Sequence, residues 1–180
     1  MIIAGIDSVI SQTLGPLIFG IVLIKVIVFA IKVRRPTIKG KVGEGIVKLN
    51  CRLYLDSQTY RILDDVTIPA SNGRTSQIDH VIVSKYGIFV IETKNYGGWI
   101  FGGADDRQWT SVHYRRKFRF QNPLRQNAGH IRALSKLLNL PSSHFHGIVR
   151  FVGDAKFKTG VPDGVFTRGH IRYIESLLSG

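Results

Sequence analysis

Residues 77–94 constrain this chain more than any other stretch, because they have the pattern of two strands joined by a tight turn. The second strand is apolar from Ile88 to Ile91 and then ends in Glu92 and Lys94. A continuous apolar run is typical of a buried strand, and residues two apart on a strand point to the same face. The carboxylate and the ammonium are therefore expected to leave the core together, as a pair.

The turn between the two strands contains Gly87, the residue type that a hairpin connection favours. Pairing across this turn would bring Asp79 of the first strand close to Glu92 and Lys94. Two carboxylates supply the oxygen ligands that a hard divalent cation prefers, and a neighbouring lysine could stabilise a phosphate or help to activate a water molecule. The sequence therefore predicts an acidic site with one lysine at an edge of the sheet.

The chain is strongly basic, with a formal net charge of +13. Only +3 of this charge lies before Pro36, so the remaining 145 residues carry most of it. Such a charge favours nucleic acid or anionic lipid as a partner, although a well-solvated surface explains it equally well. The single cysteine, Cys51, excludes a disulfide within the chain and a cysteine-based zinc site.

The segment 14–33 is nearly all apolar and is about as long as a bilayer is thick. Lys25 interrupts it at a cost of about 3 kcal/mol on insertion scales, which the surrounding apolar residues should outweigh. A cleaved signal peptide is disfavoured, because basic residues do not precede the run and no Ala-x-Ala site follows it. We expect residues 1–36 to form a single-pass membrane anchor with a basic flank, and residues 37–180 to form one further domain. The basic residues after the run place that domain in the cytoplasm by the positive-inside rule; they are Lys32, Arg34, Arg35, Lys39 and Lys41.

A helical pattern extends from Glu44 to Leu55, with Ile46, Leu49 and Leu53 on one face and Val47 and Tyr54 beside it. Glu44 would then lie in the first turn. Two interpretations stay open at this point. Glu44 is either a favourable charge at a helix N-terminus or a third acid directed towards Asp79 and Glu92.

The remaining chain predicts a mixed α/β fold. An antiparallel meander of three strands should pack one face against the first helix, and parallel pairing is expected for the later strands because helices separate them. Gln126 falls in the first turn of a helix that Pro123 opens. The expected strands are 60–69, 77–83, 86–94, 99–101, 108–110, 117–120, 147–152 and 165–167, and the later helices are 122–138 and 170–178.

Basic and aromatic residues alternate in the segment 107–120. Cations can neutralise phosphates while flat rings stack on bases, so this segment is a candidate nucleic-acid interface; a half-buried strand with a basic polar face is an equal alternative. The candidate nucleic-acid-binding residues are Arg107, Arg115, Arg116, Lys117 and Arg119.

Several of these motifs together resemble the nuclease-related domain (NERD) family, which is grouped with the PD-(D/E)xK nuclease superfamily. The resemblance covers about residues 39–178. The matching segments are Gly43-Glu44, Gln77-Ile78-Asp79-His80-Val81, residues 87–95, Asn122-Pro123 with Gln126, and residues 151–158 with Arg172-Tyr173-Ile174.

The resemblance implies a restriction-endonuclease-like central mixed sheet flanked by helices. It also implies a Mg²⁺ or Mn²⁺ site formed by Asp79 and Glu92 with Glu44 as the helix acid, so it favours the second interpretation of Glu44. Lys94 would complete the catalytic set, and Gln126 would make an accessory contact. Ile78 departs from the superfamily pattern, which often has proline at that position.

The function expected from all of this is a membrane-anchored, metal-dependent nuclease that hydrolyses phosphodiester bonds, with DNA as the expected substrate. The alternatives are a membrane-tethered domain that binds nucleic acid without cleaving it, and a module that docks on anionic lipid or protein. A homo-oligomer or an unidentified protein partner is compatible with the sequence as well.

Overall fold

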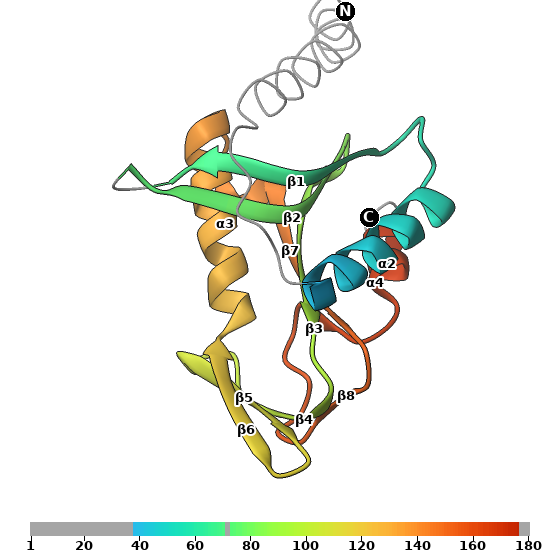
Figure 1. The fold of residues 1–180 in the computed structure, drawn as a ribbon. Coiled ribbons are helices and arrows are strands. Elements are labelled where there is room, and N and C mark those ends of the chain that lie inside the picture. Colours follow the sequence, from blue (N-terminus) through green and yellow to red (C-terminus); the bar gives the residue numbers. More distant parts are fainter. Residues whose placement is uncertain (1–37, 71–72, 177–180) are drawn as a thin grey trace, which may run out of the picture.

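The computed structural model describes residues 38–70 and 73–176 (Figure 1). The predicted anchor and the predicted domain boundary at residue 36 lie outside the described residues. Within the described ranges, no helix is long and apolar enough to cross a membrane. The elements are α2 (Ile38–Tyr54), β1 (Arg61–Pro69), β2 (Thr75–Ser84), β3 (Gly87–Asn95), β4 (Gly98–Phe101), β5 (Gln108–His113), β6 (Arg116–Gln121), α3 (Pro123–Leu138), a 3₁₀ turn (Ser142–His144), β7 (Phe145–Val152), β8 (Ala155–Phe157), β9 (Val165–Phe166) and α4 (His170–Ser176).

The larger sheet has the strand order β1-β2-β3-β7-β9. β1, β2 and β3 form the predicted antiparallel meander, and β2 joins β3 through a two-residue turn that ends at Gly87, whose φ is 140°. β7 pairs with β3 in parallel, and β9 pairs with β7 in parallel. The predicted parallel pairing is thus confirmed. The chain reaches β7 from β3 by way of β4, β5, β6 and then α3.

The strands after β3 do not extend that sheet but form a second one, in the order β6-β5-β4-β8. The predicted central mixed sheet is thus accompanied by a second sheet, which the sequence did not indicate. The change of sheet occurs at Gly98, whose φ is 79° and where a Cβ atom would lie 2.3 Å from the carbonyl oxygen of Val112. Only glycine tolerates this backbone conformation so close to a neighbouring strand, and the second sheet begins there.

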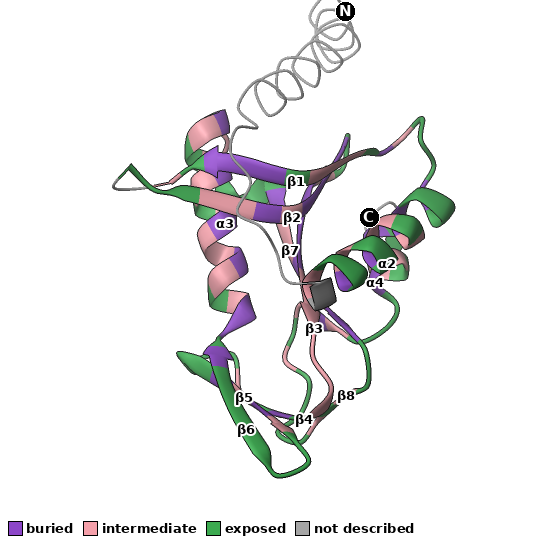
Figure 2. Cartoon of the chain, in the orientation of Figure 1, coloured by how far each residue is buried: buried purple, intermediate pink, exposed green. Residues whose placement is uncertain are grey.

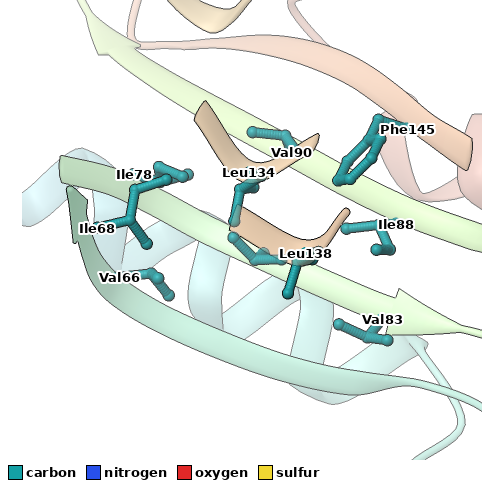
Figure 3. Close-up of a cluster of buried hydrophobic side chains, with 10 residues drawn as sticks. Val66, Ile68, Ile78, Val83, Ile88, Val90, Leu134, Leu138 and Phe145 are labelled. Carbon is teal, nitrogen blue, oxygen red and sulfur yellow. The ribbon is translucent and has the colours of Figure 1, made fainter. Parts of the chain in front are cut away.

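Helices cover both faces of the larger sheet, as the alternation along β3 requires. Ile88 and Val90 pack towards α3, where Leu134 and Leu138 complete one core cluster (Figure 3). The neighbours of these strand residues face the other way, in a cluster with α2 and α4. That cluster contains Val47, Cys51, Phe89, Ile91, Ile148 and Ile174.

α2 does not pack by the face that carries Ile46, Leu49 and Leu53. Val47 and Cys51 are fully buried, whereas Ile46, Leu49 and Leu53 are 45%, 58% and 66% exposed. The helix has two apolar stripes, and the one that packs begins at Gly43. A Cβ atom at Gly43 would lie 2.8 Å from a side-chain carbon of Val152, so glycine lets the helix approach β7 closely.

Candidate active site

Asp79 and Glu92 stand where β2 separates from β3. The ladder between these strands ends at the pair His80–Ile91. One residue further, Oδ2 of Asp79 accepts a hydrogen bond of 2.6 Å from the backbone N–H of Thr93. The carboxylate thus takes the position of a strand carbonyl, and it is held beside Glu92 as the hairpin pattern predicted.

Lys94 lies between Glu92 and α3. Its ammonium donates to Oε1 of Glu92 and, at 3.0 Å, to Oε1 of Gln126. The cap of α3 positions Gln126, because the side-chain oxygen of Asn122 accepts from the N–H groups of Leu124 and Arg125. The structure therefore brings Gln126 to the lysine end of the site.

His130 contacts the other oxygen of Glu92, with Nε2 3.1 Å from Oε2. Its Nδ1 lies 2.6 Å from the hydroxyl oxygen of Ser76 on β2. Glu92 accepts a hydrogen bond from Nε2 of His130, and Nδ1 of the same ring shares a hydrogen bond with the Ser76 hydroxyl. Sequence reasoning missed both residues, although His130 lies one helical turn after Gln126 and thus on the same face of α3.

Glu44 approaches the same site from α2. It lies in the second turn of this helix, which begins at Ile38, and no acidic residue occupies the first turn. The interpretation of Glu44 as a charge at the helix N-terminus was therefore wrong. Together with Asp79, Glu92 and Lys94 it lines a cavity of about 780 Å³.

The far wall of this cavity belongs to the second sheet. His113 and Phe118 of β5 and β6 line it there, Tyr96 lines it from the connection before β4, and Asp154 from the connection before β8 adds a fourth carboxylate. Asp154 packs against Gly97, where a Cβ atom would lie 2.3 Å from Oδ1. The cavity thus has an acidic side at the ends of β2 and β3 and an aromatic side on the β5–β6 hairpin.

The two strand carboxylates have opposite pKa shifts. Burial, followed by the charges of Glu92 and Glu44, raises the pKa of Asp79 to about 7. Burial also acts to raise the pKa of Glu92, but the hydrogen bonds and charges of His130 and Lys94 outweigh it and hold that pKa below its usual value. The pKa of Glu44 is raised as well, first by burial and then by the charge of Asp65. Among the described residues that line the cavity, Lys94 is the one ammonium beside the carboxyl groups of Glu44, Asp79 and Glu92.

This donor set is compatible with a divalent cation, because carboxylate oxygens are the ligands that Mg²⁺ and Mn²⁺ prefer. Burial and then the charges of Glu92 and Glu44 raise the pKa of Asp79, and a cation would relieve the repulsion among these carboxylates. As placed, however, no group of three or more His, Cys, Asp or Glu side chains is close enough to hold a metal within residues 38–70 and 73–176. Both oxygens of Glu92 are engaged, so a cation there would replace the contact with Lys94.

The predicted basic residues do not line this cavity. Arg115 and Arg116 lie with His113 and Tyr114 around the tip of the β5–β6 hairpin. In β6 the residues alternate, so Arg116 shares the face of Phe118, whereas Lys117 and Arg119 point to the opposite face. Arg107 is exposed in the loop before β5. The predicted nucleic-acid-binding residues are thus divided between the two faces of the second sheet and the loop before β5.

His80 lies on the other side of β2 from the cavity, as its position next to Asp79 predicted. Its Nδ1 is 2.8 Å from Oδ1 of Asp64. The other oxygen of this carboxylate, Oδ2, pairs with Lys48 at 2.8 Å and with Arg52 at 3.1 Å. Burial would raise the pKa of Asp64, but its hydrogen bonds with His80 and Lys48 lower it to about 2. This ion-pair cluster ties α2 to β1 and so helps to position Glu44.

Comparison with known proteins identifies the family of this chain. A protein of Bacillus anthracis described as uncharacterized is 42% identical over 125 residues, which make up 68% of this chain and 58% of that protein. The chain therefore spans a little over half the length of this relative. No solved structure matches the chain, so the restriction-endonuclease-like architecture stays a prediction. The family model for the nuclease-related domain matches residues 39–152, a range that contains all five predicted catalytic residues, and the chain belongs to this family.

Proposed function

We propose that this protein is a membrane-anchored, metal-dependent nuclease that hydrolyses phosphodiester bonds of nucleic acid, with DNA as the substrate. The observation that carries the proposal is the convergence of Glu44, Asp79, Glu92 and Lys94 on one cavity. The raised pKa of Asp79 supports it, because perturbed carboxylates in a cleft are typical of sites that bind cations or transfer protons.

Asp79 and Glu92, assisted by Glu44, would hold Mg²⁺ or Mn²⁺. When bound, such a cation polarises a phosphodiester and lowers the pKa of a water molecule. Glu92 is oriented for this task by His130, and Asp79 by the N–H of Thr93. Release of Lys94 from Glu92 would leave its ammonium hydrogen-bonded to Gln126 and directed at the site, where it can stabilise the negative charge that develops on the phosphate.

The membrane part of the proposal rests on the sequence of residues 14–33 and on the basic residues that follow them. It places the domain on the cytoplasmic side of the cell membrane. Support comes from α2, which starts a few residues later and exposes a stripe of apolar side chains: Val42, Ile46, Leu49 and Leu53. A helix with such a stripe beside exposed basic residues suits the surface of a bilayer.

A second candidate function is a membrane-tethered domain that binds nucleic acid without cleaving it. The ion pair of Lys94 with Glu92 favours this alternative, because both groups are buried or nearly so and satisfy each other. In that case the pair stabilises the junction of β3 with α3 and does no chemistry.

The experiment that tests the proposal measures cleavage of plasmid and single-stranded DNA by the full chain in a non-ionic detergent. Reactions contain Mg²⁺, Mn²⁺ or a chelator, and the variants are Asp79→Asn and Lys94→Ala. Matched controls are Asp105→Asn and Lys136→Ala, which change exposed residues away from the cavity. Cleavage that needs metal and is lost only in the first two variants supports the nuclease; DNA binding without any metal-dependent cleavage supports the second candidate.

A further inference from the structure

The second sheet has two faces of different character. Ile100, Trp109 and Phe120 are buried on the inner face, in the cluster that joins this sheet to β7. Side chains alternate along each strand, so Trp99 and Phe101 point outward on β4, and they are 50% and 36% exposed. No helix among the described elements packs on this outer face: α2 and α3 contact the larger sheet instead.

The strand register arranges the outer face in two rows. In the first row Trp99 pairs with Val112, which pairs with Lys117; in the second row Phe101 pairs with Thr110, which pairs with Arg119. Figure 2 shows that β6 is exposed along most of its length. Rows on one face of a strand are about 7 Å apart, and neighbouring strands are about 4.8 Å apart. The two aromatic rings therefore stand next to each other, with a cation two strands away in each row.

β8 supplies further positive charge at the other side of β4. Lys156 pairs with Trp99 in the register and is exposed. Lys158 places Nζ 4.7 Å from the centroid of the Trp99 ring. Among the described positions of β4, β5, β6 and β8 that point outward, none is Asp or Glu. Two exposed rings are thus bordered on both sides by cations.

We propose that this outer face is a binding site for single-stranded nucleic acid, separate from the acidic cavity. Trp99 and Phe101 would stack on two successive bases, while Lys117, Arg119, Lys156 and Lys158 contact the phosphates on either side. The proposal favours a single strand over a duplex, because paired bases already stack on each other and offer no free face to a flat sheet. This outer face is opposite to the face that carries Ser111 and Phe118, which line the cavity. Binding to the outer face therefore does not depend on whether the protein cleaves nucleic acid at the cavity.

The test uses the full chain in a non-ionic detergent with a chelator, so that binding is measured without cleavage. A labelled oligothymidylate reports affinity by fluorescence anisotropy. Trp99→Ala combined with Phe101→Ala should weaken binding by on the order of 30-fold, given the usual contribution of stacking per base. Lys117→Ala combined with Arg119→Ala should reduce the slope of log affinity against log salt by about 1.4, since each phosphate contact on a single strand contributes about 0.7.

Two matched controls remove similar groups elsewhere. Tyr54→Ala removes an exposed ring on α2, and Arg132→Ala with Lys136→Ala removes two exposed cations on α3; both should leave affinity within about twofold. The chain has two tryptophans, and Trp109 is fully buried, so quenching of tryptophan fluorescence by the oligonucleotide should come from Trp99. Trp99→Phe should retain binding and lose most of the quenching.

Three results would overturn the proposal. In the first, the variant with both aromatic residues replaced keeps its affinity and an intact circular dichroism spectrum. In the second, duplex DNA binds as tightly as the single strand through the same residues. In the third, these residues bind phosphatidylserine vesicles but not the oligonucleotide. The last result would assign the face to a membrane surface.

Discussion

His130 Nε2 lies 3.1 Å from Oε2 of Glu92, while the ammonium of Lys94 contacts Oε1 of the same carboxylate. Glu92 is 3% exposed and His130 is 8% exposed, so this contact is made away from water. A buried carboxylate with both oxygens engaged has little freedom to rotate. His130 therefore fixes the orientation that Glu92 presents to the cavity.

Replacing His130 tests this positioning role. If Glu92 holds the metal as proposed, His130→Ala should lower the apparent affinity of the protein for Mn²⁺ by about 10–100-fold, because residues that orient a metal ligand typically contribute that much. The measurement is the rate of DNA cleavage as a function of Mn²⁺ concentration. His130→Gln should restore part of the affinity, since the amide can donate to Oε2 of Glu92.

The control for this prediction is His144→Ala, which changes an exposed histidine in the 3₁₀ turn. It should leave the Mn²⁺ dependence unchanged. A His130→Ala protein that is destabilised but binds Mn²⁺ as tightly as the wild type would show that His130 supports the fold and does not position Glu92.

Asp79→Asn should stabilise the metal-free protein at pH 8. The pKa of Asp79 is raised to about 7, mainly by burial and then by Glu92 and Glu44, so ionisation of this group opposes folding. The associated stability is fully present below the unfolded pKa near 4 and is lost as pH rises through about 7. The asparagine keeps an acceptor for the N–H of Thr93 and avoids this loss. We expect a gain of about 1–3 kcal/mol at pH 8.

Thermal unfolding in a chelator at pH 5 and pH 8 measures this effect. The difference between variant and wild type should be larger at pH 8. Mn²⁺ should raise the melting temperature of the wild type and not that of the variant, because a ligand stabilises only the state that binds it. A variant less stable than the wild type at pH 8 would contradict the raised pKa.

The larger sheet and the centre of the site could be predicted from the sequence, because both depend on local patterns. The apolar run before Glu92 fixed the alternation along β3, and the short turn at Gly87 fixed its register with β2. Asp79, Glu92 and Lys94 follow directly from these two constraints. His130 could not be placed in this way, since its contact with Glu92 spans 38 positions and depends on how α3 packs.

Two further features depended on tertiary structure. The face of α2 was ambiguous because Val47 with Cys51 and Leu49 with Leu53 are equally apolar pairs at helical spacing, and the close approach at Gly43 decides between them. The backbone conformation at Asp65, within β1, could not be predicted from the sequence either. Asp65 has a φ of 54° between the register pairs Asp64–His80 and Val66–Ile78, a conformation that few side chains adopt.

Substitutions on α2 distinguish its two apolar stripes. Val47→Ala should lower the free energy of unfolding by about 2 kcal/mol, because it removes two buried methyl groups and leaves a cavity. Leu49→Ala changes a side chain that is 58% exposed and should change stability by less than about 0.5 kcal/mol. Urea denaturation of the full chain in a mild detergent measures both. An equal loss in the two variants would mean that the exposed stripe is covered in solution.

Asn122 should be the most sensitive polar residue outside the cavity, because it joins α3 to the loop between β4 and β5. It is fully buried, and its oxygen caps α3 while its amide nitrogen donates to the carbonyl groups of Gly103, Ala104 and Asp106 at 3.3, 2.9 and 2.7 Å. Asn122→Ala removes the cap and the hydrogen bonds to the three loop carbonyl groups, which together should cost about 3 kcal/mol.

Asn122→Asp separates these two roles. Aspartate retains the cap oxygen and is normally as good an N-cap as asparagine. If the cap were the whole contribution of Asn122, the Asn122→Asp protein would therefore be nearly as stable as the wild type. The structure predicts a loss at least as large as in Asn122→Ala, because a buried carboxylate would then face three carbonyl oxygens. Raising the pH from 5 to 8 should enlarge the loss as the new carboxylate ionises. Urea denaturation at both pH values measures this loss. A stable Asn122→Asp protein would show that the cap is the whole contribution of this residue and that other contacts hold the β4–β5 loop.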